Sequence, residues 1–323
     1  MKLAIGIDIG GTNTVIGLVD HKGLIIKKKT IKTKEHESPD LFFYAIYIEI
    51  EKLTGRFTDF KPIGIGIGAP NGNNFTEEII NPPNLNWPTI HVPTILKKHT
   101  DIKVLLTNDA NSAALGEKQF GVAKAMNNFV VITLGTGLGS GVFVNGHLVY
   151  GNRGFAGEMG HMSINPDGRK CNCGKKGCLE MYVSAKGITQ TVKNLYLTQP
   201  ESRFLNELLG NAKIKDVNGN VSGRDIDRAF DKGNPTAKKI YEYTSKKLGY
   251  GLSQVATLLE PEAFIFYGGL SYAGDRILDP AKKYLNQNLI PFQRDSFDLL
   301  LSGLNDGDAG ILGAASLIFN SNN

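Results

Sequence analysis

Two stretches of the sequence share one pattern: Leu3–Val19 is LAIGIDIGGTNTVIGLV, and Phe129–Val144 is FVVITLGTGLGSGVFV. Each consists of an apolar run, a turn of glycine and threonine, and a second apolar run, after which come a further turn and a third run. Apolar, β-branched runs bounded by glycine are typical of β-hairpins. The repetition predicts two related α/β halves that face each other across a cleft.

Patterns outside these two stretches predict helices and further strands. The expected helices are Asp40–Leu53, Pro235–Leu259 and Ala309–Phe319. The expected additional strands are Ile63–Ile67, Val104–Leu106 and Ala263–Tyr267. The last helix is rich in small residues and is expected to pack back on the first half. Strands that alternate with helices indicate an α/β fold.

Length and composition are those of an ordinary globular protein. The 323 residues suffice for two domains with substantial cores, and the basic residues behind the net charge of +5 are scattered rather than clustered. No apolar run approaches the ~18 residues of a membrane span. Asp8 and Gly10 interrupt the N-terminal apolar run too early for a signal peptide. We therefore expect a cytoplasmic protein that binds neither nucleic acid nor membrane.

All three cysteines, Cys171, Cys173 and Cys178, lie within eight residues, and His161 precedes the first of them by ten. Three thiolates and one imidazole form the tetrahedral ligand set of a structural Zn²⁺ site. A disulfide would leave one thiol over, and a redox pair would have the spacing Cys-x-x-Cys. The cluster predicts a zinc site, with a fortuitous group of thiols as the alternative.

Two carboxylates flank the predicted zinc ligands. Glu158 lies three residues before His161, and Glu180 lies two residues after Cys178. A metal at the cluster would hold both carboxylates and the imidazole in a fixed relation. Such an arrangement suits a ligand with many hydroxyl groups.

The glycine turns Gly10-Gly11-Thr12 and Gly135-Thr136-Gly137 are candidate phosphate sites. Glycine lets backbone N–H groups approach an anion, and threonine adds a hydroxyl donor. A simple hairpin bend is the alternative for each turn, and neither turn fits a Walker loop or a dinucleotide fingerprint. Asp8 precedes the first turn and suggests an outer-shell partner of Mg²⁺. A strand-end aspartate bonded to the turn is the other interpretation.

A candidate general base follows the predicted strand at Val104–Leu106. Asn108 and Asp109 come at the carboxyl end of that strand, where open α/β sheets bind their ligands. A carboxylate at this position could accept the proton of an alcohol during phosphoryl transfer. An N-capping aspartate fits the same local sequence equally well.

Taken together, these motifs resemble those of the ROK family of sugar kinases, in the actin-like ATPase superfamily. The matching motifs are Asp8-Ile9-Gly10-Gly11-Thr12, Asn108-Asp109-Ala110-Asn111, Leu134-Gly135-Thr136-Gly137, Glu158-Met159-Gly160-His161 and Cys171-x-Cys173-Gly174-x₂-Gly177-Cys178-x-Glu180. The resemblance implies two actin-like ATPase (ribonuclease H-like) domains facing a central cleft. The small domain would span residues 1–119, completed by a helix at about 303–323, and the large domain residues 120–302, with a zinc-binding loop at 161–178.

The resemblance also implies roles for individual residues in the ATP-dependent phosphorylation of a hexose, with Asp109 as the catalytic base. The sugar ligands would be Gly68, Asn84, Asn108, Asp109, Glu158, His161 and Glu180. The nucleotide would be bound by Asp8, Gly10, Gly11, Thr12, Asn13, Gly135, Thr136, Gly137, Gly268 and Gly269, with Mg²⁺ accompanying ATP. Structural zinc would be bound by His161, Cys171, Cys173 and Cys178. A homodimer is expected, with a tetramer as the alternative.

Two further features bear on the activity. The segment Asn84-Leu85-Asn86-Trp87 and the Cys178-Leu179-Glu180 motif resemble glucokinases most, with fructokinase, N-acetylmannosamine kinase and N-acetylglucosamine kinase as alternatives. The family also contains repressors, which carry a helix-turn-helix domain ahead of the first glycine turn. Because only seven residues precede Asp8 and Asp109 is present, catalysis is expected rather than non-catalytic sugar sensing. Glu260-Pro261 stands where relatives commonly have Asn/Asp-Pro.

Overall fold

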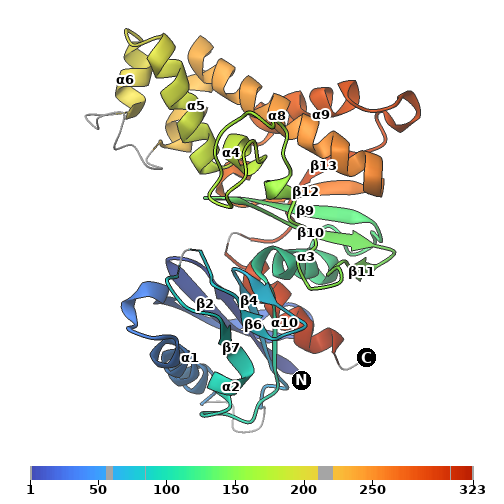
Figure 1. Cartoon of the computed structure of the whole chain (residues 1–323). Helices are drawn as coiled ribbons and strands as arrows, with labels where there is room; N and C mark the ends of the chain where they lie inside the picture. Colours follow the sequence, from blue (N-terminus) through green and yellow to red (C-terminus); the bar gives the residue numbers. More distant parts are fainter. Residues whose placement is uncertain (1, 56–60, 84, 210–220, 306, 322–323) are drawn as a thin grey trace. The chain divides into compact units, whose positions relative to one another are not determined.

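The computed structural model describes residues 2–55, 61–83, 85–209, 221–305 and 307–321 (Figure 1). Asn84, a predicted sugar ligand, lies outside the described residues. The strands are β1 (Leu3–Ile9), β2 (Asn13–Asp20), β3 (Ile25–Lys32), β4 (Ile65–Ala69), β5 (Gly72–Asn73), β6 (Glu78–Ile79), β7 (Ile90–His91), β8 (Val104–Asn108), β9 (Phe129–Leu134), β10 (Leu138–Val144), β11 (His147–Leu148), β12 (Ala263–Tyr267) and β13 (Asp298–Leu301).

The helices include all three that the sequence predicts. The α-helices are α1 (Pro39–Thr54), α2 (Val92–Leu96), α3 (Asp109–Phe120), α4 (Glu180–Val183), α5 (Ala185–Thr198), α6 (Arg203–Leu209), α7 (Gly223–Asp231), α8 (Pro235–Leu259), α9 (Asp275–Gln287) and α10 (Ala309–Asn320). The short 3-10 helices are η1 (Thr33–Glu35), η2 (Met159–His161), η3 (Gly269–Ala273) and η4 (Pro291–Gln293). Among the helices of the described residues, none combines the length and apolar character needed to cross a membrane.

The first sheet has the strand order β3-β2-β1-β4-β8 and is covered on both faces. Alternate residues of β1 point to opposite sides. Leu3, Ile5 and Ile7 join a buried cluster with the phenylalanines of α1, whereas Ala4 joins a cluster with apolar residues of α10. Gly6 lies on the α10 face, where a Cβ would stand 2.0 Å from the carbonyl oxygen of Ile311. The small residues of β1 therefore allow α10 to pack directly on the sheet.

Three neighbouring strands of this sheet end at one edge. Strand β4 pairs in parallel with β1 and with β8, so their carboxyl ends lie together. The register aligns Asp8 with Gly68 and Ala69 with Asn108. Strand β4 begins at Ile65 rather than at the expected Ile63 and continues to Ala69, alongside the last residues of β8. The edge brings Asp8, Gly68 and Asn108 together, as the ligand edge of an α/β sheet requires.

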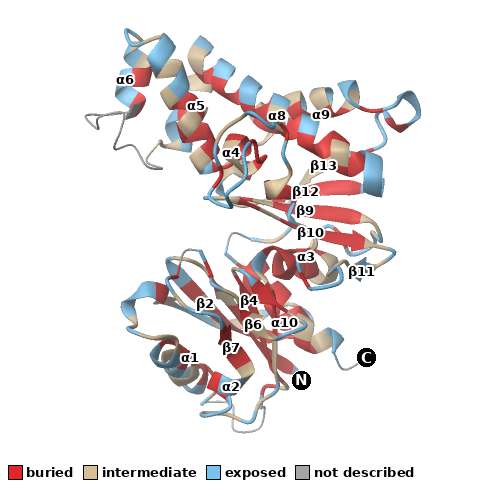
Figure 2. Cartoon of the chain, in the orientation of Figure 1, coloured by how far each residue is buried: buried red, intermediate tan, exposed pale blue. Residues whose placement is uncertain are grey.

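The second sheet repeats the layout of the first, with the order β11-β10-β9-β12-β13. Its central strand β9 and the neighbouring strand β12 are almost entirely buried (Figure 2). Helices α8 and α9 pack against each other after this hairpin unit. A small third sheet joins the two-residue strands in the order β5-β6-β7. The hairpins and third strands expected from the repeated sequence pattern are confirmed.

The chain forms two units of mutually contacting residues. The first contains Met1–Val131, Gly141–Gly157 and Ser302–Asn323, and the second contains Ile132–Ser140 and Glu158–Leu301. Helix α10 belongs to the first unit, where it packs against α3, β1 and β4. The domain bounds predicted from the sequence, 1–119 and 120–302, stay predictions, because the two units are defined by contacts between residues and not as domains.

Glu260 ends α8 in a strained backbone conformation. Its φ of 44° and ψ of 58° are left-handed, and its N–H caps the helix by donating to Ala256 O at 2.9 Å. Glycine and asparagine tolerate this conformation, whereas other residues lose roughly 1 kcal/mol or more there. We expect Glu260→Asn to raise the free energy of unfolding by about 0.5–1 kcal/mol, measured by thermal and urea denaturation. Glu201→Asn, at an exposed turn position without a positive φ, is the control that should bring no gain. An unchanged or lower midpoint for Glu260→Asn would contradict this explanation.

Candidate active site and metal centre

Asn108 and Asp109 lie at the junction where β8 passes into α3. Asn108 is the N-cap of α3, and its Oδ1 accepts a hydrogen bond from Ala110 N–H at 2.9 Å. Asp109 is the first helical residue, and its Oδ1 accepts from the same N–H, also at 2.9 Å. The sequence left Asp109 as either a base or an N-cap. Because Asn108 fills the cap position, capping does not account for an aspartate at 109.

Asp109 combines an exposed residue position with a desolvated carboxyl group. Asp109 is exposed. Desolvation by the surrounding protein nevertheless raises its pKa, while hydrogen bonds from Ala110 N–H and from the Asn108 side chain act in the opposite direction. The carboxylate of Asp109 is therefore more basic than that of an ordinary aspartate.

Asp8 is the second carboxylate at this edge. It lies on the α10 face of β1, where a Cβ on Gly310 would stand 2.4 Å from its Cγ. Only a glycine in the first turn of α10 leaves room for this side chain. Desolvation, and secondarily the charge of Asp109, raise the pKa of Asp8 to about 7. The residue therefore has an unusual environment for an aspartate, which suits a group that meets a cation.

The raised pKa of Asp8 predicts how stability depends on pH. The folded protein binds this proton more tightly than the unfolded chain, so stability from this group is full at low pH and is lost as pH rises from about 4 to about 7. We expect Asp8→Asn to be more stable than the parent at pH 8, by up to a few kcal/mol, and this advantage should shrink as pH falls and nearly vanish below about pH 4. Thermal melting without Mg²⁺ or nucleotide measures this, with the exposed Asp101→Asn as control. A stability difference between variant and parent that does not change with pH would refute the raised pKa of Asp8.

The first glycine turn is closed by hydrogen bonds within its own unit. Gly10 N–H donates to Asn13 O at 3.0 Å, and Gly10 O accepts from the Thr33 hydroxyl at 2.8 Å. Thr12 and Asn13 are exposed at its tip. Gly68 follows on β4, and a Cβ there would stand 2.7 Å from Ser112 Cβ of α3. Gly68 is thus required for helix packing, whatever its contact with a ligand.

The second glycine turn lies between β9 and β10. Gly135 N–H donates to Gly137 O at 3.0 Å, and Thr136 is exposed at the tip. Gly268, with a φ of 100°, ends β12 beside it, since a Cβ there would stand 2.7 Å from Leu134 O. The two segments predicted to bind the phosphates and the adenosine therefore lie at the same edge of the second sheet.

The four predicted zinc ligands converge. The ligand atoms of His161, Cys171, Cys173 and Cys178 all lie within 4.8 Å of one another. Cys173 Sγ is 3.6 Å from Cys178 Sγ, and Cys171 Sγ is 3.7 Å from His161 Nδ1. These are the separations expected between ligands of one tetrahedral ion with bonds of about 2.0–2.3 Å.

The chemistry of this donor set fits Zn²⁺. Burial raises the pKa of the Cys178 thiol to about 12, and it also raises the pKa of Cys171. Buried thiols of this kind ionise when a cation is bound beside them. Gly177 has a φ of 75°, and a Cβ there would stand 1.7 Å from Asn165 O, so the loop closes only with glycine. His161 would bind through Nδ1, while its Nε2 lies 4.0 Å from Glu158 Oε2.

Glu180, a predicted sugar ligand, also contacts the second glycine turn. It is the first residue of α4, directly after Cys178-Leu179, and is half-buried. Its Oε2 accepts a hydrogen bond from Leu138 N–H at 3.0 Å. The sequence analysis had no signal for this contact, because 42 residues separate the partners.

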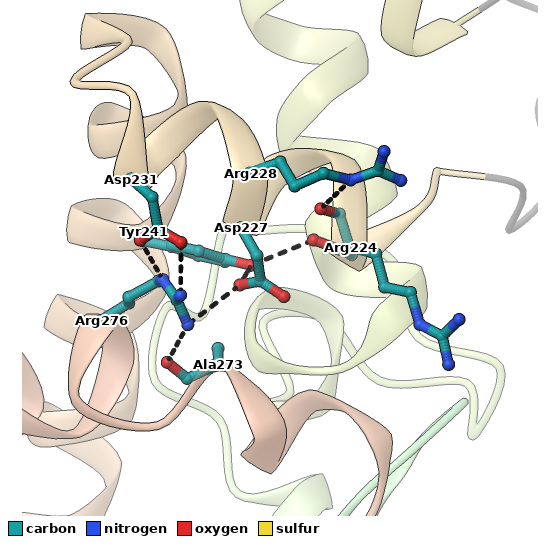
Figure 3. Close-up of polar contacts among 8 residues, drawn as sticks. Arg224, Asp227, Arg228, Asp231, Tyr241, Ala273 and Arg276 are labelled. Carbon is teal, nitrogen blue, oxygen red and sulfur yellow. Dashed lines mark hydrogen bonds and ion pairs between the residues drawn. The ribbon is translucent and has the colours of Figure 1, made fainter.

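An ion-pair network that the sequence analysis missed holds the segment after Gly268-Gly269 (Figure 3). Arg276 of α9 donates through Nε and Nη2 to the two carboxylate oxygens of Asp231 on α7, at 2.8 and 2.6 Å. Its Nη1 donates to Ala273 O, the last residue of η3, at 3.2 Å. Asp227 accepts from the Tyr241 hydroxyl at 2.7 Å. The network fixes η3 against α7, and Arg276 holds the pKa of Asp231 below its usual value.

The fold and the site define the class to which this protein belongs. Two sheets of equivalent layout, each with a glycine turn after its first strand, form the α/β fold of the actin-like ATPases, as the sequence predicted. The chain belongs to the ROK family, whose model matches residues 4–321. The resemblance drawn from the motifs is thereby confirmed.

Similar proteins include both enzymes and regulators. The glucokinase of Streptomyces coelicolor is 34% identical over 319 residues, which are 98% of this chain and 98% of the relative. The crystal structure of a ROK family glucokinase from Streptomyces griseus, in complex with glucose and AMPPNP, is 32% identical, with a TM-score of 0.80 and 98% of both chains covered. The xylose repressor of Bacillus spizizenii is 29% identical over 317 residues, which are 98% of this chain and 76% of the repressor.

Proposed function

We propose that this protein transfers the γ-phosphoryl group of ATP to the primary 6-hydroxyl of a hexose, with D-glucose as the preferred acceptor. The observation that carries the proposal is the desolvated carboxyl group of the exposed residue Asp109, held at the edge where Asp8 and the first glycine turn also lie. The glucokinases among the relatives, and the glucose and AMPPNP in one of the similar structures, support the choice of substrates.

In this proposal, Asp109 accepts the proton of the 6-hydroxyl group while the oxygen of that hydroxyl group attacks the γ-phosphorus. The new O–P bond forms as the bond from the γ-phosphorus to the β–γ bridging oxygen breaks, and ADP leaves. The raised pKa of Asp109 makes it a better proton acceptor near neutral pH. Asn108, Glu158, His161 and Glu180 hold the sugar hydroxyls, together with Gly68 and Asn84.

The nucleotide would be held by backbone N–H groups of the two glycine turns. The proposed contacts to the phosphates are Gly10, Gly11, Thr12 and Asn13 of the first turn and Gly135, Thr136 and Gly137 of the second. Gly268 and Gly269 close over the adenosine, and the Arg276–Asp231 ion pair keeps η3 in place for that role. Mg²⁺ accompanying ATP would balance phosphate charge, with Asp8 near it.

Zinc has a structural role in this proposal. His161, Cys171, Cys173 and Cys178 would hold it, and the ion would fix the loop that carries Glu158 and Glu180 at its ends. The His161 Nε2 then stays available to a sugar hydroxyl. The reduced thiols that this site requires suit the cytoplasm, and a homodimer is the proposed assembly, testable by light scattering.

The release of ADP from ATP and Mg²⁺, measured against glucose, fructose, mannose, N-acetylmannosamine and N-acetylglucosamine, tests the function. We expect the highest kcat/KM with glucose. Highest turnover with another hexose would keep the kinase and change its substrate. The xylose repressors among the relatives favour a second candidate, a non-catalytic sugar-binding regulator. Sugar binding without ADP release for any of these acceptors would select that candidate.

A further inference from the structure

The carboxylate of Glu180 contacts the second glycine turn, Gly135-Thr136-Gly137, which is proposed to bind phosphate. Its Oε2 accepts the hydrogen bond from Leu138 N–H at 3.0 Å, directly after the turn Gly135–Gly137. A Cβ added to Gly137 would stand 2.5 Å from the same Oε2, so the turn and the carboxylate are packed against each other. Gly137 has no positive φ, and this contact accounts for glycine at that position.

The other end of the turn is held by the residues that follow Glu180, where α4 passes into α5. Ala185 N–H, in the first turn of α5, donates to Gly135 O at 3.0 Å. Ser184 links the start of α5 to Glu180, because its hydroxyl donates to Glu180 O at 2.7 Å and accepts from Gly187 N–H at 3.1 Å. The turn is therefore anchored at both ends by the segment Glu180–Ala185, which follows the last cysteine of the zinc loop.

We propose that Glu180 is a positioning residue that couples sugar binding to the geometry of the phosphate-binding turn. One carboxylate oxygen would hold the sugar, while Oε2 holds Leu138 N–H. This inference rests on the proposed function, since it requires Glu180 to meet the sugar. A sugar that fixes the Glu180 carboxylate then also fixes the turn that binds ATP, and so raises the affinity for ATP. By thermodynamic linkage, the nucleotide raises the affinity for the sugar by the same factor.

The turn itself offers a matched pair of variants. Gly137→Ala places a methyl group against Glu180 Oε2 and must displace the carboxylate or the turn. Gly135→Ala is the same change two residues earlier, and nothing lies within 4 Å of its Cβ. We expect Gly137→Ala to raise the dissociation constant of glucose about tenfold or more in the absence of nucleotide, by calorimetry. Gly135→Ala should leave it within about twofold.

A second pair tests the coupling from the sugar side and guards against misfolding of Gly137→Ala. Glu180→Gln replaces the charged acceptor of Leu138 N–H by a neutral one, and we expect weaker binding of AMPPNP measured without sugar, by about threefold to tenfold. Glu158→Gln changes the carboxylate beside His161, and it should weaken the binding of glucose without changing the binding of AMPPNP measured without sugar. Melting temperature and zinc content identify folded variants.

The outcomes separate this inference from the proposed function. Wild-type protein that binds none of the hexoses would overturn both. Wild-type binding of glucose, with equal affinities for Gly137→Ala and Gly135→Ala, would overturn the coupling and leave the kinase intact. Unchanged AMPPNP affinity in folded Glu180→Gln would likewise overturn it. Weaker glucose binding in Gly137→Ala but not in Gly135→Ala, together with weaker sugar-free AMPPNP binding in Glu180→Gln but not in Glu158→Gln, would support it.

Discussion

Replacing Asp109 by asparagine is expected to lower kcat by about 10²–10⁴-fold or more while leaving the dissociation constant of glucose within a few-fold of the parent value. The substitution keeps an oxygen that can accept from Ala110 N–H, and the N-cap Asn108 is untouched, so α3 should start as before. Only the capacity to take a proton is removed. Steady-state ADP release and calorimetric sugar binding, measured on the same preparation, separate the two effects.

Asp101→Asn provides a matched control for this result. Asp101 is an exposed aspartate that precedes β8, whereas Asp109 follows it, so the same chemical change is made at the opposite end of one strand. The control should keep the parent rate. A near-parental rate for Asp109→Asn would remove Asp109 from the role of base, and equal losses of rate in both variants would indicate general damage to the unit.

The second large effect is expected at the metal. Cys173→Ser should release the zinc ion and weaken glucose binding together, by about tenfold or more, because structural zinc contributes directly to the folding of its loop. His161 is both a predicted ligand of zinc and a predicted sugar contact, and Glu180 follows Cys178 by two residues. Zinc content by mass spectrometry, glucose binding and the melting temperature should all fall in this variant.

Asn172→Ser is the control for the metal variant, since Asn172 is exposed in the same loop between two predicted ligands. It should keep zinc and sugar affinity. The loop is also held by backbone hydrogen bonds such as Ile164 N–H to Gly177 O at 2.9 Å. If the native protein contains no zinc, or if Cys173→Ser loses zinc with unchanged glucose affinity, the structural role of the metal is wrong.

Elements whose ends are marked by local chemistry were predictable from the sequence. Helix α8 has the predicted bounds, and its ends are marked in the local sequence: Asn234 caps it, Pro235 opens it and Glu260 ends it. The three two-residue strands β5, β6 and β7 are too short to produce a period. Helix α9 contains Pro280 in its interior, which argues against a continuous helix when the sequence alone is considered.

The candidate site divides in the same way. The zinc ligands lie within a short stretch of chain, so spacing alone indicated them. The cap at Asn108 was missed because Asn108 and Asp109 both suit the start of a helix, and only the backbone decides between them. Contacts across long sequence separations, such as Glu180 with Leu138 and Arg276 with Asp231, depend on tertiary packing and leave no local pattern.

The most direct test of the account is the identity of the reaction product. Purified protein, ATP, Mg²⁺ and glucose are incubated, and the mixture is followed by ³¹P NMR beside the Asp109→Asn variant. We expect equal amounts of glucose 6-phosphate and ADP from the parent protein and neither from the variant on the same timescale. Glucose that binds while ATP stays intact, or phosphate transferred to a hydroxyl other than the 6-hydroxyl, would contradict it.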